Sequence, residues 1–228
     1  MYSVICKYTK MGDLKFISHL DILRLMQRAV NRAKLPAKYS EGFNPHMKTS
    51  FGYPLSLGVE SLGEYFELQL VEKVEINKLI VDLNAVMPNK MKILNAVYYD
   101  GKESLMSLCK YAEYLINIES TKINTVELNK LLNVMINEGV IFTKEKRNKA
   151  KKKIVKKEIN TKNLIHFAQA KTVNENKIII EVVFKTSADG SMKASDFIKV
   201  LEENNIVVDY FNALKVESLN ADLKPIIE

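Results

Sequence analysis

The apolar positions along the chain follow two different spacings, which predict strands and helices in alternation. Residues 2–8 alternate apolar and polar side chains, as a strand with one buried face does. Residues 19–33 repeat apolar side chains every three to four positions, which predicts an amphipathic helix. The same patterns predict helices at 75–86, 125–137 and 194–203, strands at 64–71, 91–99, 111–118, 177–185 and within 208–219, an irregular strand at 48–57, and a strand that begins at 140–143.

These elements fall twice into the order strand, helix, strand, strand, helix, strand. That order predicts an α+β protein with two tandem ferredoxin-like (βαββαβ) domains. A short polar linker near Gly101 places the first domain at 1–101 and the second at 105–228. The two halves share no visible residue-level identity, so the repeat concerns the architecture alone.

The first predicted helix combines a capping signature with a row of cations. Ser18 and Asp21 have the spacing at which a serine hydroxyl accepts hydrogen bonds from the free N–H groups of the first turn. Arg24, Arg28 and Arg32 follow four residues apart, so they project from one face of the helix. We interpret this row as an anion-binding ridge. The alternative is a solvated helix face on which Asp21 partly neutralises the arginines.

A polar loop follows this helix and is rich in residues that bind nucleic acids. Pro36 ends the helix, and Gly42 and Pro45 shape the loop YSEGFNPH at 39–46. The candidate donors to a phosphate or a base edge are Ser40, Asn44, His46, Lys48 and Ser50, and the candidate rings for stacking on bases are Tyr39, Phe43, Phe51 and Tyr53. In the alternative interpretation some rings fill the core and the polar groups satisfy a tight turn.

The most basic segment, 144–162, contains ten Lys or Arg residues against two Glu residues. We interpret this segment as a hairpin or arm that binds a phosphate backbone. The alternative is a β-hairpin whose lysines are only solvated. The residues that we expect to contact nucleic acid here are Lys146, Arg147, Lys151, Lys152, Lys153, Lys156 and Lys157. Binding of this kind weakens steeply as the salt concentration rises.

The composition of the 228 residues bounds the class of partner and the compartment. A formal net charge of +7 favours an anionic partner, either a nucleic acid or a phosphorylated surface. Between these we favour RNA, with tRNA and rRNA as candidate classes. No apolar run reaches the length of a membrane helix, and the first residues do not resemble a secretory signal, so we expect a cytoplasmic protein without a membrane partner. Cys6 and Cys109 lie far apart and outside any metal motif, so we expect no metal and no cofactor.

Two histidines leave an enzymatic alternative open. His19 follows the helix cap and His46 follows Pro45, and a fold that brought them together would suit acid–base work on a ribose hydroxyl. A histidine at a helix start is more often a hydrogen-bonded structural residue. We therefore favour a protein without catalytic residues and keep a metal-independent ribonuclease as the alternative.

Four segments carry a resemblance to a known family. The FISHLD segment at 16–21, the SEGFNPHMKTSFGYPLSLGVES run at 40–61 and EYFEL at 64–68 resemble the radical-SAM-linked bacterial proteins of unknown function, and KKEINTKNLI at 156–165 is similar to a basic segment of that family. The resemblance implies a radical SAM enzyme as partner. The resulting hypothesis is an RNA-binding accessory protein that presents RNA to this enzyme, and the third alternative is an adaptor that binds only protein.

Overall fold

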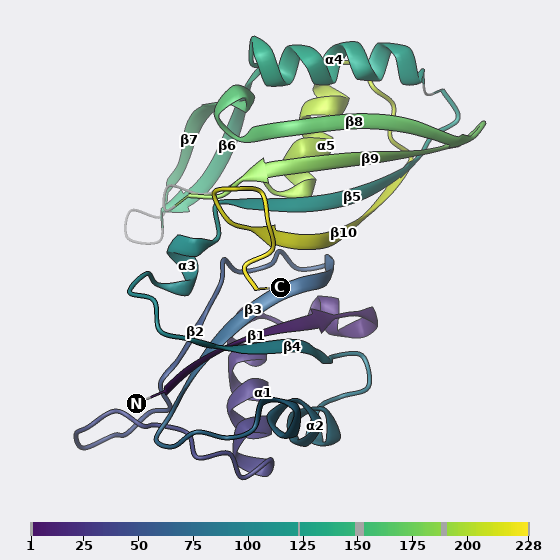
Figure 1. The fold of residues 1–228 in the computed structure, drawn as a ribbon. Helices are drawn as coiled ribbons and strands as arrows, with labels where there is room; N and C mark the ends of the chain where they lie inside the picture. Colours follow the sequence, from purple (N-terminus) through teal and green to yellow (C-terminus); the bar gives the residue numbers. More distant parts are fainter. Residues whose placement is uncertain (1, 123, 149–152, 188–190, 228) are drawn as a thin grey trace. The chain divides into compact units, whose positions relative to one another are not determined.

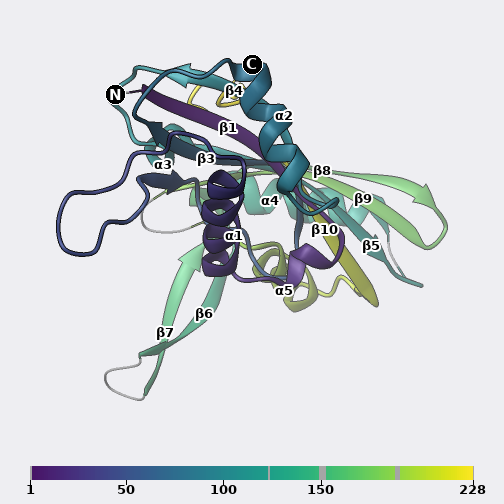
Figure 2. The ribbon, with the colours of Figure 1, turned by 90° about the horizontal axis from the view of Figure 1, so that it is seen from below.

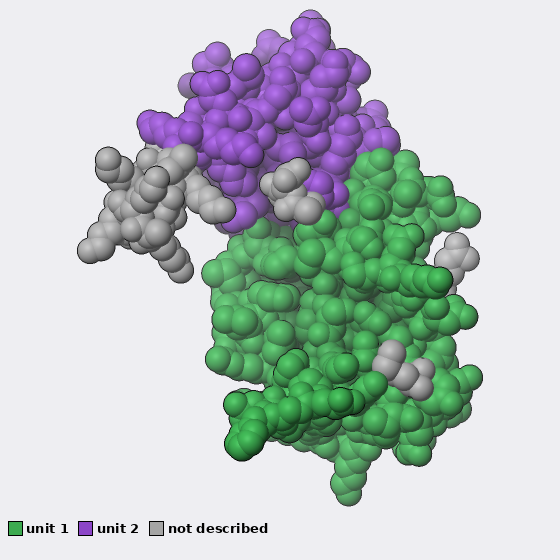
Figure 3. All heavy atoms as spheres, turned by 90° about the vertical axis from the view of Figure 1, so that its left-hand side faces the viewer, with its two compact units in different colours: residues 1–111, 214–228 green, residues 112–213 purple. Residues whose placement is uncertain are grey.

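The computed structural model describes residues 2–122, 124–148, 153–187 and 191–227, with the backbone alone for 145–148 and 153–155. The chain forms two compact units (Figure 3). Unit 1 contains Met1–Tyr111 and Leu214–Glu228, and unit 2 contains Ala112–Ala213. Each unit combines strands with helices, so the protein is α+β, as predicted. The predicted boundaries at 101 and 105 stay a prediction.

Unit 1 is built on a mostly antiparallel sheet. Its elements are β1 (Tyr2–Lys10), the 3₁₀ helix η1 (Gly12–Phe16), α1 (His19–Arg32), β2 (Thr49–Phe51), β3 (Glu60–Leu70), α2 (Ile76–Val86), β4 (Ile93–Tyr99), α3 (Leu105–Leu108) and the second half of β10 (Tyr210–Leu219). β1 lies between β4 and β3 and is antiparallel to both. The opposite edge of β3 pairs with β2 at one end and with β10, in parallel, at the other.

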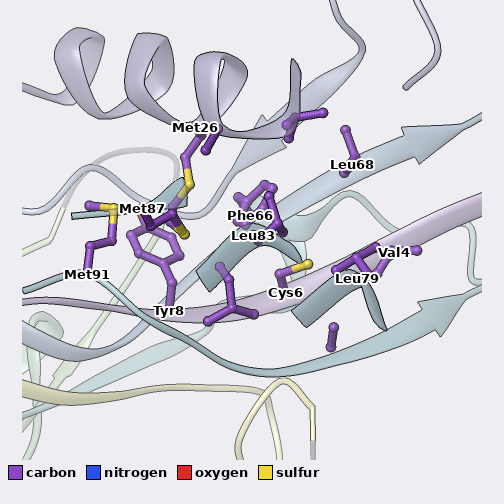
Figure 4. Packing of buried hydrophobic residues seen from close by; sticks show 14 of the residues in the cluster. Val4, Cys6, Tyr8, Met26, Phe66, Leu68, Leu79, Leu83, Met87 and Met91 are labelled. Atoms are coloured by element: carbon purple, nitrogen blue, oxygen red, sulfur yellow. The ribbon is translucent and has the colours of Figure 1, made fainter. Parts of the chain in front are cut away.

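Helices α1 and α2 cover one face of this sheet (Figure 1). Val4, Cys6 and Tyr8 point from β1 toward the helices because alternate residues of a strand share a face. They meet Met26 of α1 and Leu83 of α2, which are fully buried (Figure 4). Burial of the remaining core residues of α1 on this side, Ile22, Ala29 and Val30, turns the opposite side of the helix toward solvent.

Unit 2 contains sheet strands, helices and a separate hairpin. Its elements are β5 (Tyr111–Glu119), α4 (Thr125–Asn137), β6 (Ile141–Asn148), β7 (Lys153–Asn160), the 3₁₀ helix η2 (Thr161–Asn163), β8 (Ile165–Asn174), β9 (Lys177–Lys185), α5 (Ala194–Glu203) and the first half of β10. The strand order is β10, β5, β9 and β8, and β6 pairs with β7 alone. Asn129 of α4 exchanges two hydrogen bonds with the backbone of Ala170 in β8, which fixes this helix on the sheet.

The structure corrects two of the predicted strands. The irregular strand expected over 48–57 extends only over Thr49–Phe51. The strand that begins near 141 is β6, which pairs with β7 and not with β9. The strand beside β9 is instead β8, which the sequence patterns did not predict. Its inward positions include Ala168 and Ala170, whereas Phe167 is 39% exposed, so the apolar alternation is weak.

Candidate nucleic-acid interface

Helix α1 presents its arginine row because its first turn is capped and its apolar side is buried. The Ser18 hydroxyl accepts a hydrogen bond from the Asp21 N–H at 3.2 Å, which confirms the predicted cap. Arg24, Arg28 and Arg32 are all exposed. Successive members of the row are four residues apart, so the helical rise separates them by roughly 6 Å along the axis.

The arginines differ in how their charge is balanced. Arg24 lies 3.5 Å from Asp21 in an exposed ion pair. The hydrogen bond from Ser18, followed by Arg24 nearby, lowers the pKa of Asp21, so its carboxylate remains charged. Within the described part of the chain, Arg28 and Arg32 have no ion-pair partner. Two guanidinium groups of the row are therefore available to an external anion.

The same arginines line a groove between α1 and the end of α2. This groove has a volume of about 560 Å³ and is lined by Ile17, Asp21, Arg24, Leu25, Arg28, Ala29, Arg32, Val86, Met87 and Pro88. A second groove of about 470 Å³ shares Arg32 and Val86 with it and adds Lys34, Glu72 and the Lys78–Asp82 ion pair. Apolar side chains thus form part of the lining, while the arginines supply charged donors. Such a combination suits an anion with apolar surface better than a free phosphate ion.

The loop between α1 and β2 projects from unit 1 (Figure 2) and is closed at its base. The Ser40 N–H donates to the His46 carbonyl at 2.8 Å, and the His46 N–H donates to the Ser40 hydroxyl at 3.0 Å. A further hydrogen bond of 2.8 Å joins the Ser40 hydroxyl to Nδ1 of His46. Gly42 supplies a φ of 115° at the tip, which a residue with a side chain rarely adopts. Ser40 and His46 therefore stabilise the closed form of this loop.

A hydrogen bond attaches this loop to helix α1. The Tyr39 hydroxyl donates to Oδ1 of Asn31 at 2.8 Å. Asn31 lies three residues after Arg28, so the two are neighbours on the helix surface. The structure consequently places the base of the loop beside the arginine row.

The remaining predicted loop residues lie in different environments. Phe43 is fully exposed and Asn44 is exposed, so neither fills the core. Lys48 and His46 line a small pocket of about 230 Å³, together with Thr49, Ser50, Glu67 and Gln69. The Ser50 hydroxyl donates to Glu67 at 2.7 Å, and Phe51 is buried in the core.

The two histidines are held by different neighbours. The ring of His19 packs edge-on against the ring of Phe51, with 5.5 Å between centroids. His46 is bonded to Ser40, as described above. Among the described residues, no hydrogen bond or ring contact joins His19 to His46. Catalysis by this pair stays an alternative hypothesis, and His19 occupies a packing position.

The basic segment is a two-stranded antiparallel hairpin of unit 2, formed by β6 and β7. Lys151 and Lys152 lie outside the described residues, and for Lys146, Arg147 and Lys153 only the backbone is described. Lys156 and Lys157 are exposed. Lys157 stands opposite Lys144, whose ammonium lies 2.7 Å from Asp196 of α5. The hairpin belongs to unit 2, whereas the arginine row of α1 belongs to unit 1.

Comparison with known proteins places the chain in a family. A family model described as an uncharacterized protein conserved in bacteria (DUF2344) matches residues 4–194. The chain belongs to this family. No curated protein sequence matches it significantly. Within the described part of the chain, no helix is both long and apolar enough to span a membrane.

Solved structures with a fold similar to that of this DUF2344 family member include a chain of a three-protein complex. A chain in the crystal structure of a Cbf5-Nop10-Gar1 complex superposes with a TM-score of 0.51 and 11% sequence identity. The match covers 94% of the present chain and 48% of the other, so the present chain spans about half the length of that neighbour. At this identity the likeness concerns the fold alone.

A buried polar cluster in unit 1 was not predicted. Lys215 of β10 pairs with Glu64 of β3 at 2.7 Å, and the two side chains are 6% and 7% exposed. Nearby, Glu217 accepts hydrogen bonds from Lys7 and, at 2.8 Å, from the Tyr65 hydroxyl. The only sequence signal is the alternation of charged and apolar residues at 214–217, which equally describes a half-exposed strand.

The buried cluster does not supply a reactive nucleophile. Burial raises the pKa of the Cys109 thiol to about 11, and the charge of Lys215 only partly opposes that shift. Burial and the neighbouring Glu217 raise the pKa of the Tyr65 hydroxyl. Both groups are therefore protonated at neutral pH. The ion pair and hydrogen bonds of the cluster hold β10 against β3.

Proposed function

We propose that the protein binds RNA through the exposed side of α1 and the groove beside it. The observation that carries this proposal is the row of arginines along that groove, because Arg28 and Arg32 have no ion-pair partner in the described structure. A guanidinium group matches the geometry of a phosphate and donates two parallel hydrogen bonds to it. The apolar groove lining gives the sugar and base of a bound nucleotide a surface to pack against.

The hairpin of β6 and β7 forms a second RNA contact in this proposal. Lys144 and Lys157 stand directly opposite each other, and like charges in that position destabilise a strand pair. Asp196 balances one of them, which leaves Lys157 for a phosphate. The hairpin therefore extends the surface available to RNA beyond unit 1.

We further infer that each unit is a ferredoxin-like domain. In unit 1 the strand order β4, β1, β3, β2 supports this inference, with β1 followed by α1 and β3 followed by α2. In unit 2 the order β10, β5, β9, β8 supports it in the same way, with the β6–β7 hairpin inserted before β8. The RNA surfaces are thus a helix face in one unit and an insertion in the other.

The sequence resemblance adds a partner to the proposal. In this part of the proposal, the protein presents RNA to a radical SAM enzyme and performs no catalysis itself. A pull-down of the tagged protein, with and without nuclease, tests the partner: enrichment of a radical SAM enzyme supports it, and absence from both samples contradicts it. Enrichment that survives nuclease treatment indicates direct protein contact.

The RNA proposal is tested by charge reversal at the two available arginines. Each phosphate contact contributes about 5-fold to affinity for a single strand in 0.1 M salt, so R28E/R32E should weaken binding to poly(U) by about 25-fold or more. The matched control is Lys102→Glu, an exposed cation of unit 1 that does not line the groove. Equal losses in R28E/R32E and K102E would contradict the proposed surface, and cleavage of RNA by the wild type would favour the ribonuclease alternative.

A further inference from the structure

We infer that Phe43 stacks on an unpaired base, so that the RNA is single-stranded where it contacts the loop; this inference rests on the proposed RNA binding. The relative exposure of Phe43 is 105%, the largest among the large hydrophobic side chains that the structure describes. An aromatic ring normally buries a large apolar area in a core or an interface. A ring held fully in water on a closed loop is therefore suited to contact a ligand.

The backbone of the loop that carries this ring is closed at its base before any ligand binds. The reciprocal hydrogen bonds between Ser40 and His46 close the loop three residues on either side of Phe43. Pro45 fixes its own φ and restricts the backbone of Asn44, while Gly42 supplies the φ of 115° at the tip. A loop backbone closed in this way loses less conformational entropy on binding than an open loop would, which favours affinity.

The surroundings of Phe43 favour a nucleic-acid base over a protein pocket. A hot-spot residue of a protein–protein interface is surrounded by contacts that exclude water. Here the neighbours of the ring along the chain, Glu41, Asn44 and His46, are polar and exposed. Sites for unpaired bases combine a single ring with nearby hydrogen-bond donors, and stacking tolerates such polar surroundings.

One RNA strand can contact the ring and the arginine row together. The hydrogen bond between Tyr39 and Asn31 joins the loop base to α1, next to Arg28. Phosphates held by Arg28 and Arg32 would leave the adjoining nucleotides beside the loop. Bases paired in a duplex face each other, so they are not available to Phe43, whereas the bases of a single strand are.

A single introduced tryptophan reports the stacking directly, because the chain contains no Trp. In the F43W variant we expect poly(U) to quench the fluorescence strongly, and the duplex poly(A)·poly(U) to leave it nearly unchanged. The matched control is Y210W, which replaces another exposed ring, 56% exposed, on β10 of unit 2. Equal responses of F43W and Y210W, or equal quenching by the duplex, would overturn the inference.

Affinity measurements separate stacking from simple apolar contact. Stacking of one base on an aromatic side chain corresponds to a loss of about 5- to 150-fold on substitution by alanine. We expect F43A to weaken poly(U) binding within that range, F43L to weaken it nearly as much, and neither to change duplex binding. If F43L binds poly(U) as tightly as the wild type, the contact is apolar rather than stacked and the inference is wrong.

The outcomes also distinguish this inference from the proposed function. Loss of binding in R28E/R32E with unchanged binding in F43A would retain RNA binding and reject stacking by Phe43. A wild type that binds neither poly(U) nor the duplex would reject both. Capture of a protein that depends on Phe43, with RNA affinity unchanged in F43A, would assign the loop to a protein partner and overturn the inference.

Discussion

The ion pair between Lys215 and Glu64 offers a quantitative test of how unit 1 is held together. The ammonium and the carboxylate are 2.7 Å apart and almost fully buried. The Ser61 hydroxyl donates to the same carboxylate oxygen at 2.9 Å. Lys215→Met keeps most of the side-chain volume and removes the positive charge, so the Glu64 carboxylate remains buried without the cation that it contacts.

The expected cost follows from that burial. Removing one partner of a buried ion pair costs about 3–5 kcal/mol, because the remaining charge stays desolvated without its ion-pair partner. For a chain of this length, about 1 kcal/mol corresponds to roughly 2–4 °C in Tm. Lys215→Met should therefore lower the Tm by roughly 6–20 °C. The double variant E64Q/K215M removes both charges and keeps an acceptor for Ser61, so it should regain most of the loss.

Thermal and urea unfolding, followed by circular dichroism, measure these differences. The matched control is Lys78→Met, because Lys78 and Asp82 form an ion pair of 2.6 Å on the surface of α2. An exposed pair at this spacing contributes about 0.3–0.5 kcal/mol, so the control should change the Tm by only a degree or two. If Lys215→Met destabilises the protein no more than Lys78→Met, the buried pair does not hold β10 in place.

Three further predictions concern single positions in unit 1. Ser18→Ala removes the cap of α1 and should lower the free energy of unfolding by about 1 kcal/mol in urea titrations, whereas Ser18→Asp should retain it. Gly63→Ala would place a Cβ atom 2.6 Å from the Cα of Glu217, so we expect a marked loss in Tm, and a wild-type Tm would contradict the close approach. Because burial raises the pKa of Cys109 from its ordinary 9.0 to about 11, the folded state keeps this proton more tightly than the unfolded state. That stabilisation is complete below pH 9 and is lost as the pH rises through about 11. The unfolding free energy of the wild type should fall more steeply over that window than that of Cys109→Ala, and equal slopes would contradict it.

Local patterns were sufficient to predict the helices and the cap. The amphipathic spacing at 19–33 and Ser18 at its start depend on neighbours within one turn, and the observed α1 matches them. The hydrogen bonds between Ser40 and His46 could not be predicted without the geometry of the loop, although the sequence analysis named both residues as candidate donors.

Long-range contacts explain what the sequence did not predict. The partners Glu64 and Lys215 are 151 residues apart, and nothing near either one signals the other. The edge strand β8 was missed because small alanines occupy its inward positions beside a lysine-rich segment. The isolated pairing of β6 with β7 likewise depends on tertiary contacts, since their alternation resembles that of any strand pair.

The salt dependence of RNA affinity tests the central claim most directly. Affinity for poly(U) should fall as salt rises, and each phosphate contact contributes about 0.7 to the slope of log affinity against log salt for a single strand. Neutralising the two available arginines in R28Q/R32Q should make that slope shallower by about 1.4, whereas K102Q should leave it unchanged. Identical slopes for the wild type and R28Q/R32Q would contradict an RNA surface on α1.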